Sequence, residues 1–129
     1  MTPKEIVLSG YQCFSEGDME GLAKIFHANA LIKCNGDHEF SGEYHGFDDR
    51  LHNFLAHIPI KYPNFSLSIL NAIEEDNRVH VHVKLTADNL DSEAVHMFVV
   101  EDELETEFHI FDDSQKIARA LGGGLHPCD

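Results

Sequence analysis

The sequence predicts an α+β domain because two hydrophobic periodicities follow one another along the chain. Apolar residues recur at helical spacing between residues 2 and 58, interrupted by short strands, and at every second position from residue 64 onward. Helices followed by a run of strands imply a sheet with helices packed on one face. A chain of 129 residues can form one such domain with a single core. We predict that this domain spans residues 1–121 and that residues 122–129 form a flexible tail.

The first helix has the clearest boundary signals. Thr2 is a good N-cap residue, Pro3 suits the first helical position, and Glu5 completes a capping box. An apolar stripe follows at Val7, Tyr11 and Phe14. Gly17 is expected to end this helix.

Two further helices are predicted, and each begins at an aspartate. Asp18 is the expected N-cap of a short helix over residues 19–26. Asp48 is the expected N-cap of a third helix, whose apolar stripe runs to residue 58, and Pro59 and Pro63 then stop it.

The remaining strands form a meander. Short strands are predicted at residues 30–34 and 39–45, on either side of a turn, and a longer hairpin at residues 65–73 and 79–86, followed by a strand at 93–100. In that hairpin Val79, Val81 and Val83 take the core face, so His80 and His82 point to the opposite face. A His-x-His pair with His96 as a third ligand has a geometry that metals use. Because the valines occupy the core, we expect the histidines on the outer sheet face and predict no metal site.

The segment from Glu105 to Leu121 carries an unusual row of polar side chains. It is predicted to be a β-hairpin, with its turn at residues 112–115. Strand alternation places Glu105, Glu107, His109 and Phe111 on one face, and Thr106, Phe108 and Ile110 on the other. The polar row either lines a cavity, where chemistry is expected, or faces water as an ordinary solvated strand.

The composition excludes several classes of function. With 9 Lys and Arg against 23 Asp and Glu, the net charge is -14, which disfavours nucleic acid and anionic membranes as partners. Cys13, Cys34 and Cys128 are odd in number and widely spaced, as is typical of reduced thiols in a cytosolic protein. The sequence lacks an apolar signal core and a run long enough to span a membrane. We therefore expect a cytoplasmic protein.

Three segments carry a family resemblance: GYQCFSEGDMEGLAKIFHANALI at residues 10–32, GEYHGFDDRLHNFLAHI at 42–58 and FHIFDDSQKIARAL at 108–121. They resemble the nuclear transport factor 2-like (NTF2-like) superfamily, specifically its SnoaL-like and ketosteroid-isomerase-like branches, over Ile6 to Leu121. The resemblance implies a cone-shaped, curved, mixed sheet wrapped around three N-terminal helices. It also implies an apolar pocket for a small molecule, no cofactor, and a homodimer through the outer sheet face.

The resemblance also suggests roles for particular residues. The position of the carboxylate base in ketosteroid isomerases falls on Cys34 or Asn35, and neither is a carboxylate. The acid of that family's oxyanion hole falls near Glu107, and its tyrosine aligns nearest Gly10, one place from Tyr11. In SnoaL-like cyclases the acid/base group lies on the late strands, where Glu107 or His109 would serve.

The sequence supports two hypotheses about function. The first is cofactor-independent acid/base catalysis on a small, largely apolar carbonyl compound, with Glu107 and His109 moving protons and Tyr11 orienting the substrate. The expected ligand-binding residues are Phe14, Cys34, Tyr44, Phe54 and Phe111. The second hypothesis is a non-catalytic ligand-binding or dimerisation module, which the missing carboxylate near Cys34 favours.

Overall fold

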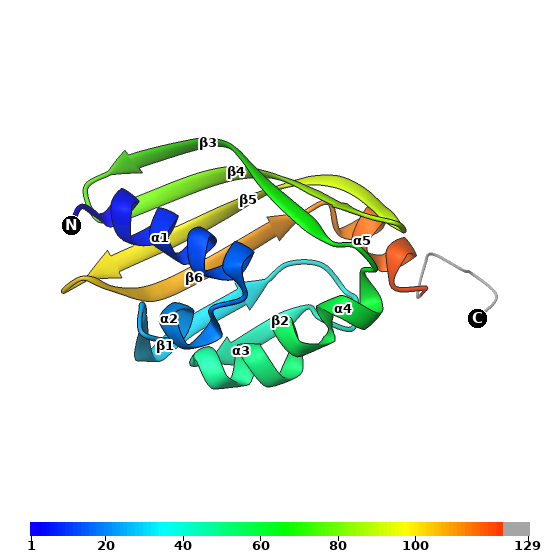
Figure 1. The fold of residues 1–129 in the computed structure, drawn as a ribbon, viewed down its shortest axis with the longest axis horizontal. Coiled ribbons are helices and arrows are strands. Elements are labelled where there is room, and N and C mark those ends of the chain that lie inside the picture. Colours follow the sequence, from blue (N-terminus) through cyan, green and yellow to red (C-terminus); the bar gives the residue numbers. More distant parts are fainter. Residues whose placement is uncertain (123–129) are drawn as a thin grey trace.

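Six strands form a single sheet that most of the helices cover on one face (Figure 1). The computed structural model describes residues 1–122. The strands are β1 (Phe26–Cys34), β2 (Gly42–His45), β3 (Ser66–Glu75), β4 (Arg78–Ala87), β5 (Leu90–Glu101) and β6 (Leu104–Asp112). Their order in the sheet is β2-β1-β6-β5-β4-β3, with β1 and β6 parallel and all other neighbours antiparallel. The predicted α+β class with a mixed sheet is confirmed.

The helices are α1 (Pro3–Glu16), α2 (Met19–Ala23), α3 (Phe47–Asn53), the 3-10 turn η1 (Leu55–His57), α4 (Ile58–Lys61) and α5 (Ser114–Ala120). Among residues 1–122 none of them is both long enough and apolar enough to span a membrane. The predicted tail falls almost entirely on residues 123–129, which lie outside the described residues.

The start and end of α1 follow the sequence signals. The Thr2 hydroxyl accepts a hydrogen bond from the backbone N–H of Glu5, and the Glu5 carboxylate accepts one from the backbone N–H of Thr2, which completes the capping box. Gly17 ends the helix in the left-handed conformation, at φ 73°. Asp18 caps α2 as predicted, through the backbone N–H of Gly21.

The predicted third helix is divided into shorter pieces. Gly46 rather than Asp48 precedes α3, which ends at Asn53. The 3-10 turn η1 and the short helix α4 follow, and Pro59 lies in the first turn of α4 instead of stopping a helix. Arg50 within α3 and Phe54 at its C-cap both line the cavity described below.

The predicted hairpin at the end of the chain is wrong in its second half. After β6, Asp113 caps the helix α5 by accepting a hydrogen bond from the backbone N–H of Lys116. The hairpin partner of β6 is β5, through a turn at Asp102 and Glu103, whose φ values of 49° and 64° are left-handed. A local capping signal was thus mistaken for a strand turn, because aspartate and serine are common in both.

The inner face of the sheet forms the core against α1. Val79, Val81 and Val83 are completely buried, as the alternation in β4 predicts. On β3 the alternation is interrupted by a bulge between Ile69 and Asn71. The bulge leaves Ile73 on the outer face, 58% exposed, whereas strict alternation from Ile69 would put it on the same face as Ile69.

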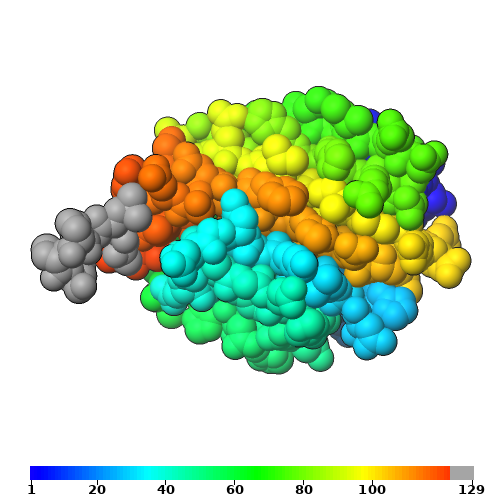
Figure 2. Space-filling model, turned by 180° about the vertical axis from the view of Figure 1, so that it is seen from behind, coloured from blue at the N-terminus to red at the C-terminus, as the bar shows by residue number. Residues whose placement is uncertain are grey.

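The outer face of the sheet is left uncovered by helices in the described chain, as the view from behind shows (Figure 2). A shallow groove runs across it, and it is lined by Asn71, Ile73, His80, His82, Val95, Met97 and Phe111. The prediction that His80 and His82 decorate this face agrees with their pairing to Met97 and Val95 on β5.

Candidate active site

A mostly apolar cavity of about 120 Å³ lies between α1, α3 and the inner face of the sheet. Cavities of roughly 150 Å³ hold a benzene ring, so this one suits a ligand built on a single ring or a comparable chain. Its polar lining residues are Tyr11, Cys34, His38, Arg50, Tyr62, His96, Glu105 and Asp112. A few polar groups in an apolar cavity are typical of a small-molecule site.

Glu105 enters the cavity because β6 contains a bulge. Val99 pairs with Glu107, but the next residue of β5, Val100, pairs with Glu105, so Thr106 is an extra residue in β6. The extra residue turns Glu105 to the inner face, where it is 2% exposed. Burial raises the pKa of this carboxyl group well above its usual value. Glu105 is therefore a proton-binding group in an apolar cavity.

Tyr11 and His96 form a hydrogen-bonded pair in the same cavity. The Tyr11 hydroxyl lies 2.6 Å from Nδ1 of His96. Burial, with a smaller effect of the Arg50 charge, lowers the pKa of His96 to about 3, so the ring is neutral at pH 7. Burial and the neighbouring Glu105 raise the pKa of Tyr11, so its hydroxyl keeps its proton. Whichever partner donates within the pair, one N–H or O–H remains to donate to a ligand.

A second polar group lies where β1 and β6 end. The Cys34 thiol is 3.7 Å from Oδ2 of Asp112. The Asn35 side chain ties the two strand ends together, since it donates to the Asp112 carbonyl at 3.0 Å and accepts from the Asp112 N–H at 3.0 Å. Burial, followed by the nearby Asp112, raises the pKa of Cys34 to about 12, so this thiol is not an activated nucleophile.

Two of the three residues expected to be catalytic lie away from the cavity. Tyr11 is on the cavity wall, as the apolar stripe of α1 suggested. Glu107 and His109 are absent from the described lining and contact each other on the opposite side of β6, at 2.9 Å between Oε1 and Nε2. Their side chains are 44% and 20% exposed, respectively. Within Glu107 to Phe111 the strand alternation is regular, and Phe108 and Ile110 form the inner face.

The expected ligand-binding residues also divide. Phe14, Cys34 and Phe54 line the cavity. Tyr44 lies behind that lining, buried, with its hydroxyl donating to the Phe40 carbonyl at 2.7 Å. Phe111 is 51% exposed on the outer face, because it shares the face of Glu107.

Several cavity residues were missed by sequence reasoning. His96 was considered only as a metal partner of His80 and His82, but it pairs with Val81 and so faces inward, on the other side of the sheet. Arg50 and His38 were not singled out at all, and Asp112 was considered only as a turn residue. Strand alternation places Asp112 on the same inner face as Phe108 and Ile110, so the sequence did carry a signal for it. The positions of His38 and Arg50 depend on how a loop and a broken helix pack against the sheet.

The fold is similar to that of solved NTF2-like proteins. A structure of an NTF2-like protein from Burkholderia thailandensis superposes with a TM-score of 0.83 at 15% identity, and covers 94% of this chain and 98% of its own. TerC, crystallised with polyporic acid, superposes with a TM-score of 0.80 at 22% identity, over 94% of this chain and 99% of its own. Bal32a, from a soil-derived mobile gene cassette, gives 0.78 at 22% identity, over 86% and 88%.

The sequence itself assigns the family. The model of the SnoaL-like domain matches residues 7–108, and the chain belongs to this family. None of the curated proteins matches the sequence. The solved structures therefore show the fold, and the family model shows the family.

Proposed function

We propose that the protein is a cofactor-independent acid/base catalyst that acts on a small, largely apolar carbonyl compound. The observation that carries this proposal is the buried carboxyl group of Glu105 in an apolar cavity, beside the Tyr11–His96 pair. This assignment replaces Glu107 and His109 by Glu105 as the group that moves protons, and it keeps Tyr11.

The proposed chemistry is proton abstraction next to a carbonyl group. The Glu105 carboxylate takes a proton from the carbon adjacent to the carbonyl, and the electron pair of the C–H bond moves into an enolate. The free donor of the Tyr11–His96 pair stabilises the negative charge on the enolate oxygen. Glu105 then returns the proton to the same or another carbon. The raised pKa means that Glu105 is protonated in part of the molecules, and that its carboxylate form, where present, is a stronger base than a carboxylate in water.

The relatives support a small-molecule site of this kind. TerC, which is 22% identical to this chain, was co-crystallised with polyporic acid. The family resemblance includes isomerases and cyclases that work without a cofactor. The ketosteroid-isomerase base position falls on Cys34 or Asn35, and neither is a carboxylate, so the proposed base lies on β6 rather than β1.

Exchange of ketone protons into heavy water tests the proposal directly. A panel of small aryl ketones, beginning with acetophenone, is incubated with the protein in D2O, and loss of the proton signals is followed by NMR. We expect acceleration by the wild type, loss of about 10²- to 10⁴-fold in Glu105→Gln, and no loss in the matched outer-face variant Glu107→Gln. Equal loss in both variants, or none in either, would contradict the assignment to Glu105. If the ketones bind without any exchange, the protein is a binding module, the second hypothesis.

We also propose that two copies associate through the outer sheet face. The exposed side chains of Ile73, Val95 and Phe111 line one groove there, at 58%, 40% and 51% exposure. A contiguous apolar patch of this kind is typical of an interface.

A further inference from the structure

Arg50 carries a buried positive charge that forms no salt bridge among residues 1–122, although Asp112 lies near enough to act on its pKa. The residue is 5% exposed, and its Nη1 has no hydrogen-bond partner among residues 1–122. The guanidinium lies over the rings of Phe54 at 3.8 Å and Tyr44 at 4.8 Å, which hold it in place. An arginine stays charged in proteins, and burying an unpaired charge costs several kcal/mol. A fold that keeps this residue in a cavity wall leaves it available for an anionic partner.

His38 supplies a second unpaired donor to the same part of the cavity. Its Nδ1 accepts a hydrogen bond from the backbone N–H of Phe40 at 3.2 Å, so in the neutral ring the proton is on Nε2. Burial lowers the pKa of His38, which favours that neutral ring. Nε2 is buried and has no partner among the described residues. The backbone of His38 is itself fixed by the Ser41 hydroxyl, at 3.0 Å.

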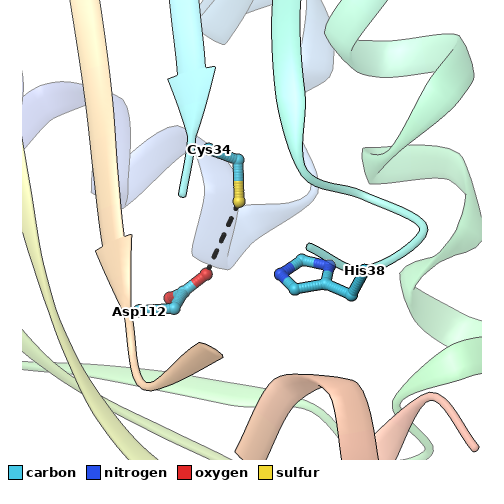
Figure 3. A group of neighbouring side chains, drawn as sticks. All are labelled: Cys34, His38 and Asp112. Atoms are coloured by element: carbon cyan, nitrogen blue, oxygen red, sulfur yellow. Dashed lines mark hydrogen bonds between the residues drawn. The ribbon is translucent and has the colours of Figure 1, made fainter. Parts of the chain in front are cut away.

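The same geometry argues against a metal ion at this point. Ligand atoms of Cys34, His38 and Asp112 lie within 4.8 Å of one another, and the ring of His38 faces the other two (Figure 3). A histidine that binds a metal through Nε2 normally donates a proton from Nδ1. Here Nδ1 accepts from Phe40 instead, and the Cys34 thiol is held protonated by its raised pKa of about 12. Both groups would have to change their protonation or hydrogen bonding before they bound a cation.

We propose that Arg50 and His38 form a subsite for a carboxylate, so that the natural ligand is an apolar carbonyl compound that also carries an acid group. The inference rests on the proposed function, because it names the substrate class of the same cavity. An incoming carboxylate accepts hydrogen bonds from Nη1 of Arg50 and Nε2 of His38, and its charge neutralises the guanidinium. Both donors, which have no partner in the protein alone, are then hydrogen-bonded, and the bond to Arg50 is charge-assisted.

The local charge supports an anion even though the whole chain carries a net charge of -14. The carboxyl groups that face the cavity are Glu105 and Asp112, and burial raises the pKa of both, which favours their neutral forms. The cavity therefore has a positive group and two groups that resist ionisation. A ligand with one negative charge is favoured over a neutral one of the same shape.

Binding of matched acids and amides tests the subsite. Benzoate, phenylacetate and cinnamate are compared with benzamide, phenylacetamide and cinnamamide by isothermal titration calorimetry at pH 7. We expect each acid that fits to bind at least about ten-fold more tightly than its amide, since hydrogen bonds between charged groups are the strong ones. Arg50→Met should remove the preference, Arg50→Lys should retain part of it, and Arg119→Met, an exposed arginine on α5, should leave it unchanged.

A second pair of variants guards against a folding effect at Arg50. His38→Phe removes the Nε2 donor and should weaken the acids more than the amides, whereas His38→Gln keeps an N–H donor and should retain part of the preference. Thermal unfolding of each variant shows whether it is folded. Equal affinity of acids and amides for the wild type would overturn the subsite and leave the ligand-binding function standing. Failure of every acid and amide to bind would overturn both.

Discussion

Glu105 and Glu107 are two residues apart on one strand, yet they lie on opposite faces of the sheet. Glu105 is 2% exposed in the cavity, whereas the Glu107 side chain is 44% exposed and contacts His109. In a regular strand residues two apart share a face, and the extra residue Thr106 breaks that rule. One bulge therefore decides which of two identical side chains is placed for chemistry.

The environments of the two carboxylates differ as much as their positions. Glu105 loses its hydration shell, so its charged form is disfavoured and its pKa rises. Glu107 stays in contact with water, where the attraction to His109 is weakened by the solvent. The comparison predicts that changes on the inner face have large effects and that the same kind of change on the outer face has small ones.

The largest difference is expected between truncations on the two faces of β6. Ile110 is 3% exposed on the inner face, and Ile110→Ala should lower the free energy of unfolding by about 2–5 kcal/mol, because it leaves a cavity in the core. Glu107→Ala should change it by less than about 0.5 kcal/mol. Urea unfolding of both variants measures the difference. If both variants lost a similar free energy of unfolding, burial would not distinguish the inner face of β6 from its outer face.

A smaller effect is expected in the pH dependence of stability. The unfolded Glu105 titrates near 4.5 and the folded one higher, so its stabilising contribution is complete below pH 4.5 and is lost as the pH rises through the raised pKa. Glu105→Gln does not titrate, and its free energy of unfolding should exceed that of the wild type by about 1–3 kcal/mol at pH 8, with the gain shrinking toward pH 5. Denaturation midpoints across this range measure it. Glu107→Gln is the control and should show no such gain. If the gain in Glu105→Gln did not change with pH, the raised pKa of the buried Glu105 carboxyl group would be refuted.

The outer face gives the next prediction, on association. Phe111→Asp introduces a charge into the proposed interface and should weaken dimerisation by at least about ten-fold, which sedimentation velocity measures across a dilution series. Ile60→Asp is the control, because Ile60 is 78% exposed on α4, away from the outer face. A wild type that is monomeric at all concentrations would remove the proposed dimer.

The smallest effect is expected for the pair between Glu107 and His109. A double-mutant cycle with Glu107→Gln and His109→Gln should give a coupling energy of about 0.2–1 kcal/mol, as for other exposed pairs. The buried pair of Tyr11 and His96, tested with Tyr11→Phe and His96→Phe, should couple more strongly, since its hydrogen bond is shielded from water. A stronger coupling on the outer face than in the cavity would reverse the comparison.

Local signals predicted most of the elements but not the fine structure of the site. The capping box at Thr2 and Glu5, the left-handed Gly17 and the alternating valines of β4 each depend on neighbouring residues, and all were confirmed. The third helix and the segment after Asp112 were wrong, because the same residue types begin helices and turns. Tyr11 was placed on the cavity wall correctly, since it belongs to the apolar stripe of α1.

The sequence by itself determined the α+β class, the helix caps, the inner valines and the family, because these depend on periodicity and on short-range hydrogen bonds. Only the tertiary structure decided that Glu105 rather than Glu107 enters the cavity and that His96, His38 and Arg50 join it there. The bulge at Thr106 arises from the pairing of β6 with its neighbours, and the burial of Arg50 arises from the packing of α3 against the sheet. Contacts between distant parts of the chain have no periodicity of their own, so the position of the candidate active site followed from folding rather than from any local pattern.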